Sequence, residues 1–382
     1  MSNEILTPTT APFSTESGVT LRDVAARVGV SVQSVSGVLN GGGSSTKRVS
    51  ARTREKIESA AEELGYRRNH AARAMRTGNT RMLGWLGGNL GEEHVGRMLD
   101  GALEASDAYG YTLKILRLGD LGNAQQVIRR ASELRLMGML ALHLPSDTQL
   151  ELHAEAQCYG YPLVLMDERS QSADVPQIIS DDEDGIAQAV AHIVELGHTR
   201  IAFVGAGTGA GVIAAQRQSA FEREVARHGL MLMSDLIVQG SFSGRDQSAG
   251  AARRLLQPGA ANRPTAIVCA GDYIALAVLQ VARELQIDVP AQLSVIGFAN
   301  MTFSDYAVPR LTTVEQPFAE IGRQAVHLLL GVIESNSKNA SPTGAGNATG
   351  ANGSRAPNGY EPLCLPTRLV VRASTGPPPA TP

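Results

Sequence analysis

The segment VTLRDVAARVGVSVQSVSGVLN, residues 19–40, predicts two short helices joined by a tight turn. Thr20 followed three residues later by Asp23 is a capping-box pattern that opens the first helix, and Gly29 is suited to end it. Ser31 can cap the second helix. The apolar positions of that second helix repeat at helical spacing: Val35, Val38 and Leu39. Two helices joined by a glycine-containing turn are typical of the helix-turn-helix, whose second helix enters the major groove of DNA.

A third helix follows, so that three helices can bury one small core. Ser50 can cap it and Gly65 can end it. Its apolar face consists of Ile57, Ala60, Ala61 and Leu64. An ordinary three-helix bundle would fit this pattern too, but the outward residues of the second helix are uncharged and small enough to approach base edges. These candidate base-reading residues are Val32, Gln33, Ser36 and Gly37.

Charge separates this segment from the rest of the chain. The 382 residues have a net charge of -3, yet residues 19–81 contain twelve Lys or Arg against five Asp or Glu. A small basic module on an acidic body indicates a polyanionic partner for the module alone, which here is double-stranded DNA. The candidate phosphate-neutralising residues are Arg22, Lys47, Arg48, Arg52, Arg54 and Arg73.

Residues 19–40 and 49–78 resemble the DNA-binding headpiece and hinge of the lac repressor/galactose repressor (LacI/GalR) family of bacterial transcription regulators. The resemblance implies that Val32 and Gln33 read bases. It implies phosphate contacts at Ser31, Ser36, Asn40 and Thr53. Three features depart from the family pattern: Gly37 replaces an Arg, the glycine-rich loop 41–48 is longer than usual, and Arg68 replaces a Pro before the hinge.

The hinge can form a helix of only about two turns, which begins at Asn69 and ends before Gly78. Isolated helices shorter than about 12–15 residues are marginal in water, so we expect DNA and a partner hinge to order this one. The resemblance implies that it lies in the minor groove with Met75 as the inserted apolar side chain. The hinge residues so identified are Asn69, Ala72, Arg73 and Met75. A plain linker is the alternative.

After residue 81, apolar runs of strand length alternate with helical patterns such as 182–196 and 273–285. The predicted strands are 82–86, 112–116, 137–142, 163–166, 200–204, 265–269, 293–298 and 311–314. This alternation is typical of parallel sheets covered on both faces, and about 290 residues favour two lobes with a ligand cleft between them.

Four motifs in this body resemble the same family's effector domain, which shares the periplasmic-binding-protein fold: ELGHTRIAFVG (195–205), SVIGFAN (294–300), PRLTTVEQP (309–317) and LPTRLVVRAST (365–375). The predicted fold is therefore a small all-α helix-turn-helix headpiece followed by an α/β two-lobed periplasmic-binding-protein-like domain. By this pattern the chain crosses between the lobes near 180–182, near 298–303 and after a helix ending near Ile333.

The expected domain organisation has five parts. A disordered leader (1–18) precedes the helix-turn-helix domain (19–67), and a hinge and linker (68–81) leads to the effector-binding and dimerisation domain (82–375). A disordered tail (376–382) ends the chain. Residues 335–358 are low in sequence complexity and have no apolar face, so they predict an insertion before the last strand.

The resemblance also implies a small-molecule effector, with polar groups from both lobes. Arg217 matches an Arg that commonly bonds effector oxygens, and Asp272 lies where the family often has an Asn-Asp pair. The remaining candidates are Asp167, Phe242 as a stacking face, and Asn300. Ala299 replaces an Asp that reads sugar hydroxyls in many members, so we expect a carbohydrate or derivative but leave a phosphorylated or non-sugar ligand open.

Two other classes of protein were weighed. A nucleotide-dependent enzyme would explain VGAGTGAG (204–211), but its GxGxGxG spacing differs from the dinucleotide motif and no catalytic constellation accompanies it. An exported solute-binding protein needs a signal peptide, which the N-terminal sequence does not predict. The three cysteines have neither disulfide nor metal-ligand spacing. We therefore expect a cytoplasmic homodimer that is not an enzyme and has no cofactor, metal site or membrane segment.

Overall fold

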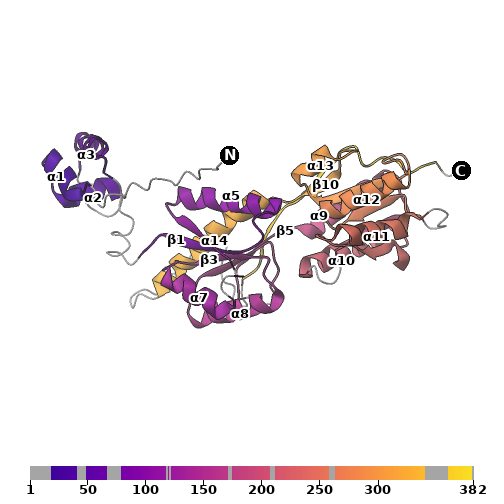
Figure 1. Cartoon of the computed structure of the whole chain (residues 1–382), viewed down its shortest axis with the longest axis horizontal. Helices are drawn as coiled ribbons and strands as arrows, with labels where there is room; N and C mark the ends of the chain where they lie inside the picture. The colour runs from indigo at the N-terminus through magenta and orange to yellow at the C-terminus, as the bar shows by residue number, and fades with distance from the viewer. Residues whose placement is uncertain are drawn as a thin grey trace, which may run out of the picture. The chain divides into compact units, whose positions relative to one another are not determined.

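The computed structural model describes residues 19–40, 49–66, 79–117, 119, 122–170, 174–206, 211–257, 263–339 and 360–380. The chain divides into two compact units, residues 1–80 and 81–382, and each is considered by itself (Figure 1). Several predictions lie outside the described residues: the leader, the loop with Lys47 and Arg48, the hinge with Asn69, Ala72, Arg73 and Met75, and most of the low-complexity insertion.

The first unit is the predicted headpiece of three helices: α1 (Leu21–Val28), α2 (Val32–Asn40) and α3 (Ala51–Glu63). Their caps are those that the sequence predicts. The Asp23 carboxylate accepts a hydrogen bond from the Thr20 backbone nitrogen at 2.8 Å, and Gly29 ends α1 with φ 73°. Ser31 accepts from the Ser34 nitrogen at 3.1 Å, which begins α2. One buried cluster joins the three helices: Val24, Ala25, Val35, Val38, Leu39, Ile57, Ala60 and Ala61.

The second unit contains two lobes, each built on one six-stranded sheet. The sheet of the first lobe has the order β11-β5-β4-β3-β1-β2, and all its pairs are parallel. Its strands are β1 (Met82–Gly87), β2 (Thr112–Leu116), β3 (Met139–Leu142), β4 (Leu163–Met166), β5 (Gln177–Ser180) and β11 (Leu363–Leu365). Its helices are α5 (Glu93–Ala108), α7 (Ala124–Glu133), α8 (Ser146–Cys158) and α14 (Phe318–Asn339).

Alternating side chains of the first-lobe strands pack on two helical layers. Leu140 and Leu142 of β3 belong to the core under α5 and α14, whereas Met139 and Ala141 belong to the core under α7 and α8. Figure 1 shows α5 on one side of this sheet and α7 and α8 on the other. The α5 and α14 backbones touch at Gly101 and Gly322, where a Cβ would overlap a carbonyl oxygen of the opposite helix.

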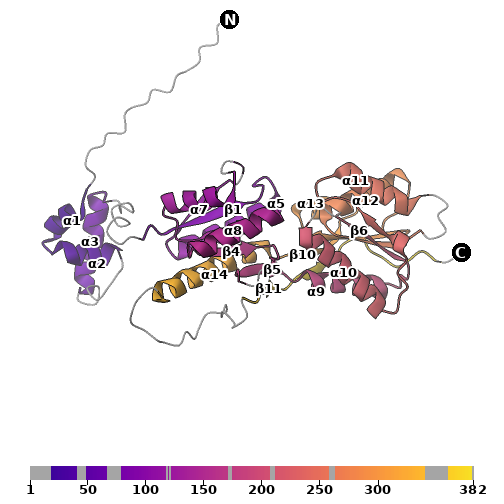
Figure 2. The same ribbon diagram turned by 90° about the horizontal axis from the view of Figure 1, so that it is seen from below.

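The second lobe has the strand order β12-β10-β9-β8-β6-β7, with β12 antiparallel to β10 and the other pairs parallel. Its strands are β6 (Ile201–Gly205), β7 (Ile237–Gln239), β8 (Ala266–Cys269), β9 (Ser294–Ala299), β10 (Thr312–Glu315) and β12 (Arg368–Val370). Its helices are α9 (Asp182–Glu195), α10 (Gly211–Arg227), α11 (Arg245–Leu256), α12 (Asp272–Glu284) and α13 (Thr302–Tyr306). Figure 2 shows α11 and α12 on one face and α9 and α10 on the other.

The chain crosses between the lobes three times, and one predicted crossing is wrong. The crossing between β5 and α9 lies at Ser180–Asp182 as predicted, and a further one joins β11 to β12. The crossing predicted at 298–303 is wrong because β9 and β10 are parallel neighbours in one sheet, so the segment between them returns to the second lobe. The chain crosses instead between β10 and α14, at residues 315–318.

Two predicted boundaries near the C-terminus need correction. Helix α14 continues through residues 335–339, and the Ser335 and Ser337 hydroxyls donate to the carbonyl oxygens four residues earlier. Gly376 was assigned to a disordered tail, but its nitrogen donates to the Ser294 hydroxyl at 3.0 Å and its carbonyl oxygen lies 2.8 Å from His198 Nε2. Among the described helices, none is long and apolar enough to cross a membrane.

Candidate DNA-reading helix and effector pocket

The N-terminal end of α2 presents two of the four predicted base-reading residues to solvent. Val32 is 41% exposed and Gln33 is exposed, while Ser36 is half-buried. Gly37 is buried, so its prediction as an outward residue is wrong, because a glycine has no side chain to project above its neighbours. Its assignment to base reading stays a prediction, as do those of Val32, Gln33 and Ser36.

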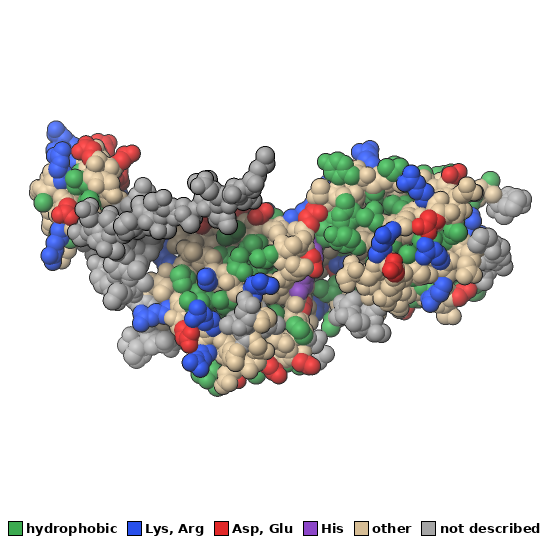
Figure 3. Space-filling model, in the orientation of Figure 1, with side chains coloured by type: hydrophobic (Ala, Val, Ile, Leu, Met, Phe, Trp, Pro, Cys, Tyr) green, Lys and Arg blue, Asp and Glu red, His purple; other side chains and the backbone are tan. Residues whose placement is uncertain are grey.

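Two of the predicted phosphate-contacting side chains already take part in the hydrogen bonds that begin the helices. The Ser31 hydroxyl lies 2.9 Å from that of Ser34, and the Thr53 hydroxyl lies 2.9 Å from that of Ser50. Arg22 and Arg52 are exposed, and Arg54 is half-buried with Glu58 at 4.0 Å. Figure 3 shows Lys and Arg side chains along one edge of the headpiece. The exposed guanidinium groups can therefore reach phosphates without breaking the caps.

A cavity of about 670 Å³ lies between the two lobes of the second unit, and both lobes contribute to its walls. Four of the five predicted effector residues line it: Asp167, which follows β4; Arg217 on α10; Phe242; and Asp272 at the start of α12. The volume lies within the range of small-molecule sites. The structure therefore brings together residues that are more than 100 positions apart in the sequence.

Arg217 is only 5% exposed and is held by neighbours from the second lobe and from a crossing segment. Its Nε donates to Asp182 Oδ2 at 2.7 Å and its Nη1 to the Ala270 carbonyl oxygen at 2.7 Å. Its Nη2 donates to Gln316 Oε1 at 3.2 Å, and the guanidinium lies 3.9 Å above the Phe298 ring. Because a guanidinium has five N–H groups, two are left to meet a ligand oxygen in the cavity.

The same contacts connect the crossing segments. Asp182 and Gln316 lie at the first and second crossings, and Gln316 Nε2 donates to the Ser180 hydroxyl at 2.7 Å. At the third crossing, the Thr367 hydroxyl donates to the Asp181 carbonyl oxygen at 2.9 Å. Burial raises the pKa of Asp182, while the charge of Arg217 opposes that rise. The pocket floor and the connections between the lobes are thus one hydrogen-bonded network.

Asp272 is 2% exposed, and its carboxylate accepts three hydrogen bonds from the second lobe. The donors are the Met301 nitrogen at 2.7 Å, the Ser304 hydroxyl at 2.7 Å and the Thr313 hydroxyl at 2.5 Å. Burial raises the pKa of this carboxyl, and these donors oppose the rise. These hydrogen bonds join α12 to α13 and β10. They use most of the lone pairs of the Asp272 carboxylate, so few remain to accept a hydrogen bond from a ligand.

Asn300 does not line the cavity, which counts against its assignment to the effector site. Its Nδ2 donates to Glu315 Oε1 at 3.2 Å, and its Oδ1 accepts from Arg372 Nη2 at 2.8 Å. Asn300 has φ 51°, a left-handed conformation at the end of β9, and its side chain bonds to these groups of the second lobe. It supports the pocket wall from outside.

The sequence interpretation missed most of the first-lobe wall of the pocket: Glu92, His94, His143, Gln149, Glu168, Arg169 and Phe318. His143 directly follows β3, just as Asp167 directly follows β4. In parallel α/β sheets, ligands bind as a rule at the carboxyl ends of the strands. That rule could have identified His143. Glu92 and His94, at the start of α5, offered no comparable signal.

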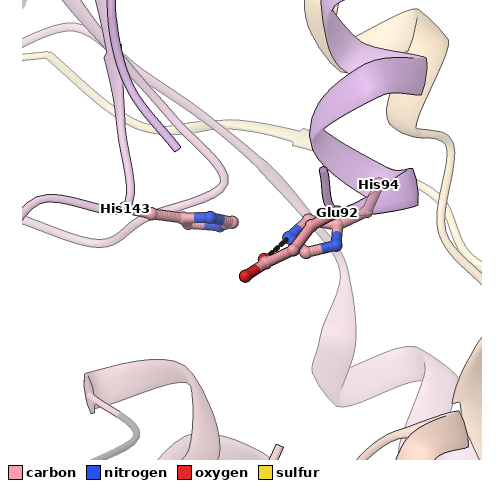
Figure 4. Close-up of side chains that lie close together, drawn as sticks. All are labelled: Glu92, His94 and His143. Atoms are coloured by element: carbon pink, nitrogen blue, oxygen red, sulfur yellow. Dashed lines mark ion pairs between the residues drawn. The ribbon is translucent and has the colours of Figure 1, made fainter. Parts of the chain in front are cut away.

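Two histidines face each other on this wall, with ring centroids 5.0 Å apart (Figure 4). His94 Nε2 lies 3.4 Å from Glu92 Oε2, and His143 Nε2 lies 3.4 Å from Asp167 Oδ2. Burial lowers the pKa of His94. Burial also acts to lower the pKa of His143, but the hydrogen bond and charge of Asp167 outweigh it and raise that pKa.

A helix-turn-helix headpiece together with a two-lobed domain that encloses a polar cavity defines a DNA-binding regulator with a ligand-binding domain. Residues 20–69 match the model of bacterial regulatory proteins of the lacI family, and residues 190–375 match the periplasmic binding protein-like domain. The HTH-type transcriptional repressor PurR of Aliivibrio fischeri (strain MJ11) is 32% identical over 312 residues, which are 81% of this chain and 90% of that protein. The chain belongs to the LacI family of bacterial transcription regulators.

Solved structures of the same family resemble the whole chain. The lac repressor dimer bound to operator and the anti-inducer ONPF has a TM-score of 0.71 and 25% identity, over 94% of this chain and 99% of that chain. The transcriptional regulator CelR in complex with cellobiose has a TM-score of 0.62 and 26% identity, over 93% and 99%. These relatives are transcription regulators, so the protein is a regulator and not the nucleotide-dependent enzyme considered from the glycine-rich segment.

Proposed function

We propose that this protein is a cytoplasmic repressor that binds a near-palindromic operator as a homodimer and responds to a small molecule in the cavity between its lobes. The observation that carries the proposal is the cavity itself, because groups from both lobes line it and Arg217 connects it to the crossing segments. A ligand that binds both walls has different affinities for different lobe arrangements. Such a difference is what allows a ligand to shift a conformational equilibrium.

Dimerisation follows from the small size of the headpiece. One helix-turn-helix makes few contacts, and two copies related by a two-fold axis read two half-sites about one or more helical turns apart. The relative whose solved structure is a lac repressor dimer on its operator supports this arrangement. Because the faces of the dimer would come from the second unit, the headpieces remain available for DNA.

A carbohydrate or carbohydrate derivative fits the chemistry of the cavity. Phe242, Tyr273 and Phe318 provide apolar ring faces, and Asp167 and Glu168 provide carboxylate acceptors for hydroxyl groups. The cellobiose complex of CelR supports the same ligand class. Ala299 lines the second-lobe wall and has no acceptor side chain, so recognition of hydroxyl groups shifts to the first lobe.

A thermal-shift screen of the full chain against sugars and sugar phosphates tests the effector proposal. A ligand present at 100 times its Kd adds about 2.7 kcal/mol to the free energy of unfolding, which is a readily measured rise in Tm. We expect at least one sugar to raise Tm in the wild type and to lose this effect in Phe242→Ala. The exposed Tyr306→Ala, in α13 and outside the cavity, is the matched control. If every Tm rise persisted in Phe242→Ala, the effector would bind elsewhere.

A further inference from the structure

The pocket wall of the first lobe holds a cluster that the regulator function does not explain. One donor atom each from Glu92, His94 and His143 lies within 4.8 Å of the other two. Glu92 is the N-cap of α5 and His94 lies in its first turn, whereas His143 follows β3. Figure 4 shows the His143 ring directed toward the other two side chains across the gap between these elements. Residues 51 positions apart thus meet at one point.

His94 has an unused buried nitrogen. Its Nδ1 is buried and has no hydrogen-bond partner among the described residues, although most buried polar atoms have one. Its Nε2 lies 3.4 Å from Glu92 Oε2, so Nε2 can share an ion with that carboxylate when Nδ1 carries the proton of the neutral ring.

His143 has the partner that metal-binding histidines usually have. Its Nε2 lies 3.4 Å from Asp167, so the carboxylate can accept the Nε2 proton and leave Nδ1 as the coordinating atom. Carboxylate–histidine–metal arrangements fix the tautomer and orientation of the ring in this way.

We propose that Glu92, His94 and His143 bind a divalent transition-metal ion of the zinc class, with a further coordination position open to the cavity. Two imidazoles and one carboxylate form the ligand set of open zinc sites, in which a water or ligand takes the fourth position. Imidazole ligands favour zinc and its transition-metal neighbours over magnesium and calcium, which prefer oxygen. The alternative is that the two histidines, each beside its neighbouring carboxylate, contact the effector directly without a metal.

The present geometry needs one adjustment to close around an ion. Metal–ligand distances of about 2.0–2.2 Å place the donors of a tetrahedral site about 3.4 Å apart, closer than the 4.8 Å limit within which they lie here. Glu92 is the most exposed member, with 47% of its side chain accessible, against 18% for His94 and 29% for His143. Rotation of the Glu92 side chain can therefore bring its carboxylate closer to the two imidazoles.

The test uses the untagged full chain after treatment with a chelator and dialysis. Titration with cobalt(II) chloride is expected to give visible absorption bands, and calorimetry with zinc chloride is expected to give one strong site per chain. His94→Ala and His143→Ala should each weaken zinc binding by at least about tenfold, the lower end of the loss that even outer-sphere partners cause. The matched control is His228→Ala, since His228 is exposed and lies outside the cluster.

Two outcomes would overturn the proposal: a wild-type chain without cobalt bands or zinc binding, and zinc affinity that is unchanged in both histidine variants. If circular dichroism showed that either histidine variant were unfolded, Glu92→Gln would decide, because this exposed side chain can change without disturbing the core. Unchanged zinc affinity in Glu92→Gln would then contradict the site, and a loss would support it. Operator binding without added metal is measured separately, so failure here leaves the proposed function standing.

Discussion

Replacing Asp182 by alanine is expected to lower the free energy of unfolding of this protein by about 3–5 kcal/mol, the cost of breaking a buried ion pair. Arg217 and Asp182 are 5% and 8% exposed, and their charged atoms lie 2.7 Å apart. The variant leaves the guanidinium buried without its counter-charge. It also removes the acceptor that the Ser180 hydroxyl uses at 2.7 Å. Denaturant unfolding of the second unit within the full chain measures the loss.

The neighbouring residue provides the control for this prediction. Glu183 also pairs with an arginine, Arg223, at 2.7 Å, but both side chains are more than half exposed. Exposed pairs contribute about 0–1 kcal/mol, so Glu183→Ala should change stability by no more than that. Arg217→Met added to Asp182→Ala should recover part of the loss, because it removes the unpaired charge. Equal effects of Asp182→Ala and Glu183→Ala would contradict the assignment of a buried network to the lobe crossings.

The affinity for operator DNA is expected to fall steeply with salt. Each neutralised phosphate contributes about 0.9 to the slope of log affinity against log salt, and six to ten contacts lose about 10³–10⁵ in affinity between 50 and 200 mM. Each copy has six candidate cations in the headpiece and hinge, so a dimer has twelve and can reach this range even if only half of them contact phosphates. Fluorescence anisotropy with a labelled duplex at several salt concentrations gives the slope.

Matched arginine variants connect this slope to the headpiece. Arg52 is exposed at the start of α3, and Arg52→Ala should reduce the slope by about one for each copy that contacts DNA. Arg227 is 77% exposed at the end of α10, and Arg227→Ala should leave the slope unchanged. A nearly salt-independent affinity, or equal effects of the two variants, would contradict the electrostatic account of the headpiece.

The three helices of the headpiece could be predicted from the sequence, because the hydrogen bonds that cap a helix join residues only three or four positions apart. Thr20, Ser31 and Ser50 begin the three helices as expected. The continuous apolar strands of the body, such as β4, were also predicted. Strands β5, β7, β11 and β12 were missed because none has an apolar run longer than three residues, and the pairing that defines them comes from distant segments. The lobe crossing at 315–318 depends on the same non-local pairing.

Residues that line the cavity could be predicted from the sequence only where the position of a residue after a strand fixes the direction of its side chain. Asp167 follows a predicted strand and lines the cavity, whereas Asn300 follows one too and turns to Glu315 and Arg372 instead. Both residues have φ 51°, so the partners of the side chain decide its direction, and a sequence does not show those partners. The contact of Arg217 with Gln316 and the histidine cluster both depend on segments far apart in the sequence, so no local pattern shows them.

Selection of duplexes from a random library by the full chain tests the central claim most directly. The account predicts enrichment of one near-palindromic sequence, with two half-sites whose centres lie one or more helical turns apart, because two copies of α2 read it. It also predicts that Gln33→Ala changes the preferred bases symmetrically in both half-sites. Enrichment of a single unpaired half-site, or of no sequence at all, would contradict a dimeric, sequence-reading regulator.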